Sequence, residues 1–87
     1  MSILKIEDIG DQVEVVVWFR HGKVLPLRFR WRGRTYKVQS INGDWRSEIG
    51  SDHYRHFAVA SDTPDVYELS YNEASGIWKL EKVAMNG

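Results

Sequence analysis

Apolar and polar residues alternate with a period of two along most of this chain, and this pattern constrains the fold most. In residues 27–32, Leu, Phe and Trp alternate with three arginines. Successive side chains of a β-strand point to opposite faces, so this segment predicts a strand with one apolar and one cationic face. Similar alternation recurs in residues 13–20, 35–39, 54–60, 66–71 and 77–83. No stretch of eleven residues carries an uninterrupted helical apolar stripe, so no long helix is expected.

Turn-forming residues separate these segments. The turn signals are His21-Gly22-Lys23, Arg32-Gly33, Asn42-Gly43-Asp44, residues 61–65 and residues 72–76. Short strands joined by tight turns predict an all-β fold, which is a strongly bent antiparallel sheet or partly open barrel of five to six strands. Residues 3–9 fit a strand or a short turn, and residues 45–53 fit a loop or a strand with a bulge at Gly50.

The chain has 87 residues, which suits a single domain over residues 1–87 with an ordered core at about 11–84. It has no cysteine, so disulfides, thiolate zinc sites and thiol nucleophiles are excluded. The first eight residues lack the features of a signal peptide, and the longest apolar run, residues 15–19, is too short to span a bilayer. We therefore expect a cytoplasmic protein without a membrane partner.

The alternation also predicts which side chains form the core. The expected inward residues are Val13, Val15, Val17, Phe19, Leu27, Phe29, Trp31, Tyr36, Val38, Phe57, Val59, Tyr67, Leu69, Tyr71, Trp78 and Leu80. Trp18 lies on the face opposite Val17 and Phe19. We expect it to be buried on a two-sided strand; the alternative is an exposed anchor beside Arg20.

Charge is balanced over the whole chain but not along it. Residues 18–46 hold eight basic residues and one acidic residue, a net charge of +7, and the other residues hold four basic and eleven acidic ones, a net charge of −7. Arginines that alternate along a strand lie on one face about 7 Å apart. The pattern predicts a cationic surface that tracks a phosphate backbone. Its candidate residues are Arg28, Arg30, Arg32, Arg34, Lys37 and Arg46.

The main alternative is an ordinary solvated sheet face. In that case the arginines pair across strands with Glu14, Glu48 or Glu68, and each pair contributes only a few tenths of a kcal/mol.

No catalytic, metal or cofactor motif stands out, so we expect neither an enzyme nor a bound cofactor. His53 and His56 are three residues apart, and a strand would place them on opposite faces. They are more typical of ordinary, partly exposed histidines than of a metal site. Ser-based elbows and Gly-rich phosphate loops are absent from the sequence.

Several aromatic segments resemble a known family of small domains. They are Phe29-x-Trp31-Arg32-Gly33-Arg34-x-Tyr36-x-Val38, Trp45-Arg46, Tyr54-Arg55-x-Phe57-x-Val59, Val66-Tyr67-Glu68-Leu69 and Trp78-x-Leu80-x-x-Val83. The sequence resembles a bacterial all-β family of unknown function, found alone and as a C-terminal appendage of inactive Y-family-polymerase-like mutagenesis proteins. The resemblance covers about residues 13–83. It implies a bacterial origin, a β fold and a DNA-repair setting, but no catalytic residue.

These observations favour a non-enzymatic binding module whose cationic strand face contacts single-stranded nucleic acid or an acidic protein. The alternative is a protein-interaction or self-association module without nucleic-acid binding, in which the +7 and −7 parts of two chains complement each other. Either interpretation fits a monomer or a weak homodimer.

Overall fold

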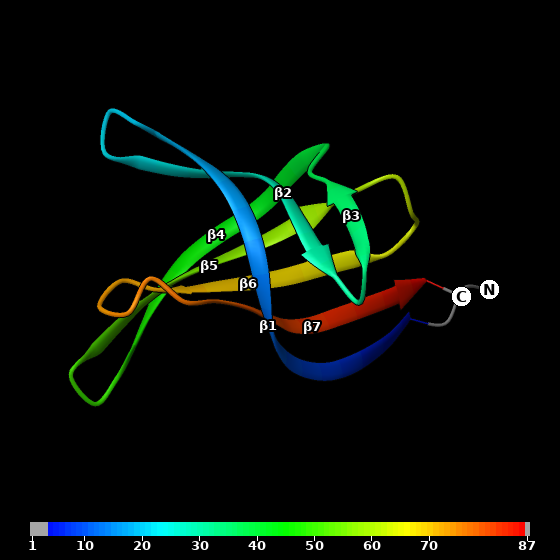
Figure 1. Cartoon of the computed structure of the whole chain (residues 1–87). Coiled ribbons are helices and arrows are strands. Elements are labelled where there is room, and N and C mark those ends of the chain that lie inside the picture. The colour runs from blue at the N-terminus through cyan, green and yellow to red at the C-terminus, as the bar shows by residue number, and fades with distance from the viewer. Residues whose placement is uncertain (1–3, 87) are drawn as a thin grey trace.

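The computed structural model describes residues 4–86, which form one antiparallel sheet of seven strands (Figure 1). The strands are β1 (Leu4–Arg20), β2 (Lys23–Trp31), β3 (Arg34–Lys37), β4 (Ser40–Ile49), β5 (Asp52–Ala60), β6 (Val66–Asn72) and β7 (Trp78–Asn86). Their order across the sheet is β3-β2-β1-β7-β6-β5-β4. The all-β prediction is confirmed, but the predicted five to six strands are too few, because residues 40–49 form a strand of their own.

β1 is the longest strand and belongs to two ladders. Its first part, from Leu4 to Val13, pairs with β7, and its second part, from Glu14 to Arg20, pairs with β2. The register with β7 shifts between Asp8 and Asp11, where Gly10 has a φ of +74°. Glycine adopts this left-handed conformation without steric cost, and a bulge of this kind bends the strand. The bend turns the β1–β2 hairpin away from the plane of β7 (Figure 1).

At one end of the sheet, the two edge strands approach each other. The backbone N–H of Val38 donates to the carbonyl of Leu27 (2.9 Å), and that of Gln39 donates to the carbonyl of Ala60 (2.9 Å). The short link between β3 and β4 therefore bonds to both sides of the sheet. The ladder itself is not closed, because β3 and β4 do not pair with each other in residues 4–86. The predicted strongly bent sheet is present in this open form.

Aromatic and branched side chains fill the concave side of the sheet. The core residues are Val13, Val24, Phe29, Tyr36, Phe57, Val59, Tyr67, Leu69, Trp78, Leu80 and Val83. Phe29 stacks on Tyr36 at a centroid distance of 5.0 Å, and Tyr67 joins both rings. Trp31 is half-buried, and its indole N–H donates to Asp11 Oδ2 at 2.8 Å. Most of the predicted core is thus confirmed.

Three local predictions are wrong, and a bulge or a strand end explains each. Val16 faces Arg28 but Val17 faces Pro26, so Leu27 is an extra residue and its side chain is exposed. Phe19 lies at the exposed end of the β1–β2 hairpin. Asn42 is likewise a bulge residue inside β4 rather than part of a turn.

The fold predicts which leucines stabilise it. Leu80 is fully buried between β1 and β6, whereas Leu4 on β1 is 61% exposed. Leu80→Ala should lower the free energy of unfolding by about 2–5 kcal/mol, because it leaves a cavity. Leu4→Ala should change it by less than about 0.5 kcal/mol. Urea denaturation followed by tryptophan fluorescence measures both, and equal losses would contradict the described core.

A second prediction concerns stability at high pH. Burial raises the pKa of the Tyr67 hydroxyl, and its hydrogen bond with Thr63 offsets part of that effect. The folded protein therefore resists deprotonation more than the unfolded chain does. This contribution is complete below the ordinary tyrosine pKa, about pH 10, and is lost as the pH rises further. Unfolding free energies measured from pH 8 to 11.5 should fall less steeply for Tyr67→Phe; identical profiles would contradict this account.

Candidate functional site

Three of the predicted cations stand together on the convex side of β2 and β3. Arg28 lies opposite Lys37 in the ladder, and Arg30 lies opposite Thr35. On the other side of β2, Arg28 pairs with Val16 and Arg30 pairs with Glu14 of β1. Paired residues share a face, and the neighbouring core residues Phe29 and Tyr36 take the opposite one. Arg28, Arg30 and Lys37 are all exposed. We call them the β2–β3 cationic face.

These three cations form no ion pair with another described residue. Within residues 4–86, none of them lies within 4.0 Å of a carboxylate oxygen. Glu14 stands opposite Arg30 in register, yet the two side chains do not form an ion pair. The alternative of one-by-one neutralisation therefore does not describe this face. Surface cations that lack intramolecular partners remain available to an external anion.

Arg32 and Arg34 do not belong to this face. Arg32 occupies the β2–β3 turn with a φ of +51°, and its Nε lies 3.7 Å from Asp11 Oδ2. Arg34 forms an ion pair with Asp62 at 3.2 Å and covers the ring of Tyr36. Both arginines thus have ion-pair partners within the fold, which sets them apart from Arg28, Arg30 and Lys37. Arg32 lies in the turn that ends the strand alternation after Trp31, and Arg34 pairs with Trp31 and shares the face of Tyr36.

Arg46 is also separate from the β2–β3 cationic face. It lies on β4, at the other edge of the sheet, where it is the register partner of Arg55. Its side chain takes the concave side with Phe57, as the pairing of Asp44 with Phe57 indicates. The structure therefore brings together three of the six predicted residues.

An aromatic residue extends the cationic face along β1. Trp18 is 48% exposed, and the guanidinium of Arg20 lies 5.2 Å from the centre of its ring. Val16 is exposed between Glu14 and Trp18 on the same side of the strand. Burial of Trp18 was the wrong expectation. The sequence signal for the exposure of Trp18 was its position opposite Val17, because only one face of β1 packs against the core.

Two shallow hollows adjoin Arg30 on this side. One, of about 360 Å³, is lined by Val16, Arg28, Arg30 and Thr35, and the other, also about 360 Å³, is lined by Gln12, Arg30 and Arg32. Glu14 and Arg30 border both, so the two hollows adjoin each other. A bound chain would therefore meet a shaped surface rather than a flat one.

Other polar clusters offer less chemistry. His53 Nδ1 lies 3.3 Å from Glu48, and His56 Nε2 lies 2.7 Å from Ser47 Oγ. His56 Nδ1 is buried and has no hydrogen-bond partner in the described part of the chain. A serine nucleophile needs a base that a third group orients, and this pair lacks that group among residues 4–86.

In the same residues, no three His, Asp or Glu side chains gather as metal ligands. These residues also hold no apolar helix long enough to cross a membrane.

The comparisons with known proteins give a family but no function. A family described as a domain of unknown function, DUF6504, matches residues 5–84. No curated protein and no solved structure shows a significant match. The bacterial origin and the association with polymerase-like proteins stay predictions. Because the match covers nearly the whole chain, the protein belongs to the DUF6504 family.

Proposed function

We propose that this protein is a non-enzymatic binding module whose β2–β3 cationic face contacts the backbone of single-stranded nucleic acid. One observation carries the proposal: Arg28, Arg30 and Lys37 project from the same face and have no ion-pair partner within residues 4–86. Phosphate contacts supply most of the sequence-independent affinity of such proteins.

The spacing of the cations fits the binding of a linear polyanion. Arg28 and Arg30 are two residues apart on one strand, which separates their Cα atoms by about 7 Å. Lys37 lies across from Arg28 at the usual distance between neighbouring strands. Long arginine and lysine side chains with this spacing on two neighbouring β-strands can contact successive phosphates of an extended nucleic-acid strand. Arginine also binds phosphate through two parallel hydrogen bonds.

The exposed ring of Trp18 favours a single strand over a duplex. Proteins that bind single strands combine a cationic track with aromatic rings on which unpaired bases stack. Trp18 lies on the same side of β1 as Val16, whose register partner is Arg28. A base could therefore stack on Trp18 while neighbouring phosphates contact the arginines. The hollows beside Arg30 give room for a sugar or base next to the arginines.

A second candidate is a protein-interaction or self-association module. Exposed apolar side chains favour it, because Val16, Trp18, Phe19 and Leu27 all lie on the β1–β2 hairpin. Sedimentation at low and high salt separates the two candidates. A salt-sensitive dimer without affinity for nucleic acid would favour this second candidate.

Binding to single-stranded DNA should depend steeply on salt. Three phosphate contacts predict a slope of about −2 for log K against log salt concentration, since each contact to a single strand contributes about 0.7. Fluorescence anisotropy with a labelled oligothymidine measures this slope. Arg28→Gln/Arg30→Gln should weaken binding at least about tenfold and reduce the slope by about 1.4.

The matched control is Lys5→Gln/Lys82→Gln, which removes the same charge from the β1–β7 ladder. It should change affinity less than about twofold, since screening weakens charges beyond about 10 Å. Equal losses in both double variants would show that net charge alone drives binding. No binding at low salt would reject the proposal.

Trp18→Ala tests the stacking part of the proposal. Removal of a stacking ring costs about 1–3 kcal/mol per base, so affinity should fall about fivefold or more. The salt slope should stay unchanged, because no phosphate contact is lost. The control is Trp45→Ala, since Trp45 is similarly exposed but lies on β4. An equal effect of both variants would contradict a role for Trp18.

A further inference from the structure

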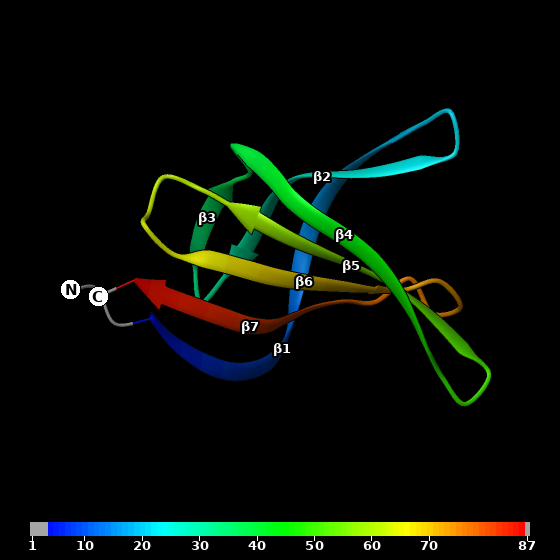
Figure 2. The ribbon, with the colours of Figure 1, turned by 180° about the vertical axis from the view of Figure 1, so that it is seen from behind.

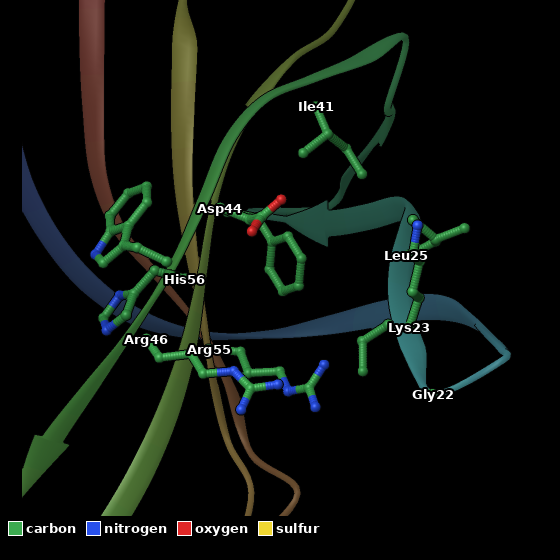
Figure 3. Close-up of a pocket in the computed structure, with 11 residues that line it drawn as sticks. Gly22, Lys23, Leu25, Ile41, Asp44, Arg46, Arg55 and His56 are labelled. Carbon is green, nitrogen blue, oxygen red and sulfur yellow. The ribbon is translucent and has the colours of Figure 1, made fainter.

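The β1–β2 hairpin stands apart from the β4–β5 ladder (Figure 2). A cavity lies between them and is lined by residues of both (Figure 3). Its volume is about 400 Å³, which lies within the usual range for small-molecule sites. Val24 and Leu25 line it from β2, and Ile41 and Phe57 line it from β4 and β5. The charged lining residues are Lys23, Asp44, Arg46 and Arg55.

Two like charges face each other in this cavity. Arg46 and Arg55 are register partners on adjacent strands, so their side chains leave the same face of the sheet. Figure 3 shows the two side chains running next to each other toward the β1–β2 hairpin, whereas His56 points away from them. Like charges directly opposite each other destabilise a sheet. An anion between the two guanidinium groups would convert this repulsion into attraction.

Arg55 is held in place through its Nε, which leaves its two terminal nitrogens available to a ligand. Its Nε donates to Glu73 Oε1 at 3.0 Å, and its side chain is only 23% exposed. Glu73 is itself fixed, because its backbone N–H donates to the carbonyl of His53 (2.9 Å). No hydrogen bond within residues 4–86 occupies the terminal nitrogens of Arg55. The terminal nitrogens of Arg55, which can bind an oxyanion, are therefore held in position before a ligand binds.

Arg46 and Lys23 complete the charge of the cavity. Neither forms an ion pair within the described residues. Together with Arg55 they give three positive charges, against the carboxylates of Asp44 and Glu73, so the site carries a net charge of +1. The remaining wall is apolar and includes the buried side chains of Val24 and Phe57.

We propose that this cavity binds a small organic anion, in which a phosphate or carboxylate group contacts Arg46 and Arg55 and an apolar body packs between Val24 and Phe57. The site is distinct from the β2–β3 cationic face, because Arg28, Arg30 and Lys37 do not line it and its two arginines lie on the concave side. It also explains the presence of two arginines in a register position that favours opposite charges.

Titration of the protein with small probes tests this proposal. Amide shifts in ¹H–¹⁵N spectra are followed with phenyl phosphate, benzoate, inorganic phosphate and phenol. Phenyl phosphate or benzoate should give saturable shifts around Leu25, Arg46 and Arg55, and whichever binds tighter identifies the anionic group. Inorganic phosphate should bind more weakly, because it lacks an apolar body, and phenol should not saturate.

Arg46→Gln should weaken binding about tenfold or more, because it removes a charge-assisted hydrogen bond. Arg28→Gln/Arg30→Gln should leave binding within about twofold, which separates this site from the proposed nucleic-acid face. Three results would each overturn the proposal: no saturable shifts, equal binding of phenol, or unchanged affinity in Arg46→Gln.

Arg46→Glu provides a readout that needs no ligand. It places opposite charges across the ladder, so the melting temperature should rise by about 1–5 °C while anion binding is lost. A lower melting temperature would show that repulsion between Arg46 and Arg55 does not destabilise the folded protein, and the proposal would fail.

Discussion

The bend of β1 at Gly10 is the constraint on which the rest of this structure depends. A single strand of 17 residues pairs first with β7 and then with β2, and the bulge between Asp8 and Asp11 lets it change direction between the two. Without the bend, β2 and β3 would continue a flatter sheet and leave Phe29 and Tyr36 without cover. With it, these rings meet Tyr67 from β6 across the concave side.

The same bend decides where the charges lie. Because Phe29 and Tyr36 turn inward, their sequence neighbours along β2 and β3 turn outward, and these include Arg28, Arg30 and Lys37. The apolar core and the β2–β3 cationic face are thus two sides of one alternating pattern. At the hairpin turn the pattern stops, and the turn residue Arg32 and the adjacent strand residue Arg34 form ion pairs with Asp11 and Asp62. The open side of the sheet then leaves Arg46 and Arg55 around a separate cavity.

The strands and core were predictable because alternation is a local property of the sequence. Residues 27–32 and 66–71 show it clearly, and the buried faces of Phe29 and Leu69 follow from it. Bulges were not predictable, since Leu27 and Asn42 shift the register without a distinctive residue type. The sequence also placed six cations in one group, because it does not show which acidic residues return to meet them. Asp62, for example, is far from Arg34 in the sequence, and the two form an ion pair only because the fold brings them together.

The central claim is that unpaired cations on the convex side of β2 and β3 bind an external polyanion. Amide shift mapping with a short oligothymidine at low salt tests it most directly, because it locates the contact on the sheet. We expect the largest shifts at Arg28, Arg30 and Lys37, with smaller ones near Trp18. Shifts confined to Arg46 and Arg55, or the absence of any shift, would contradict it.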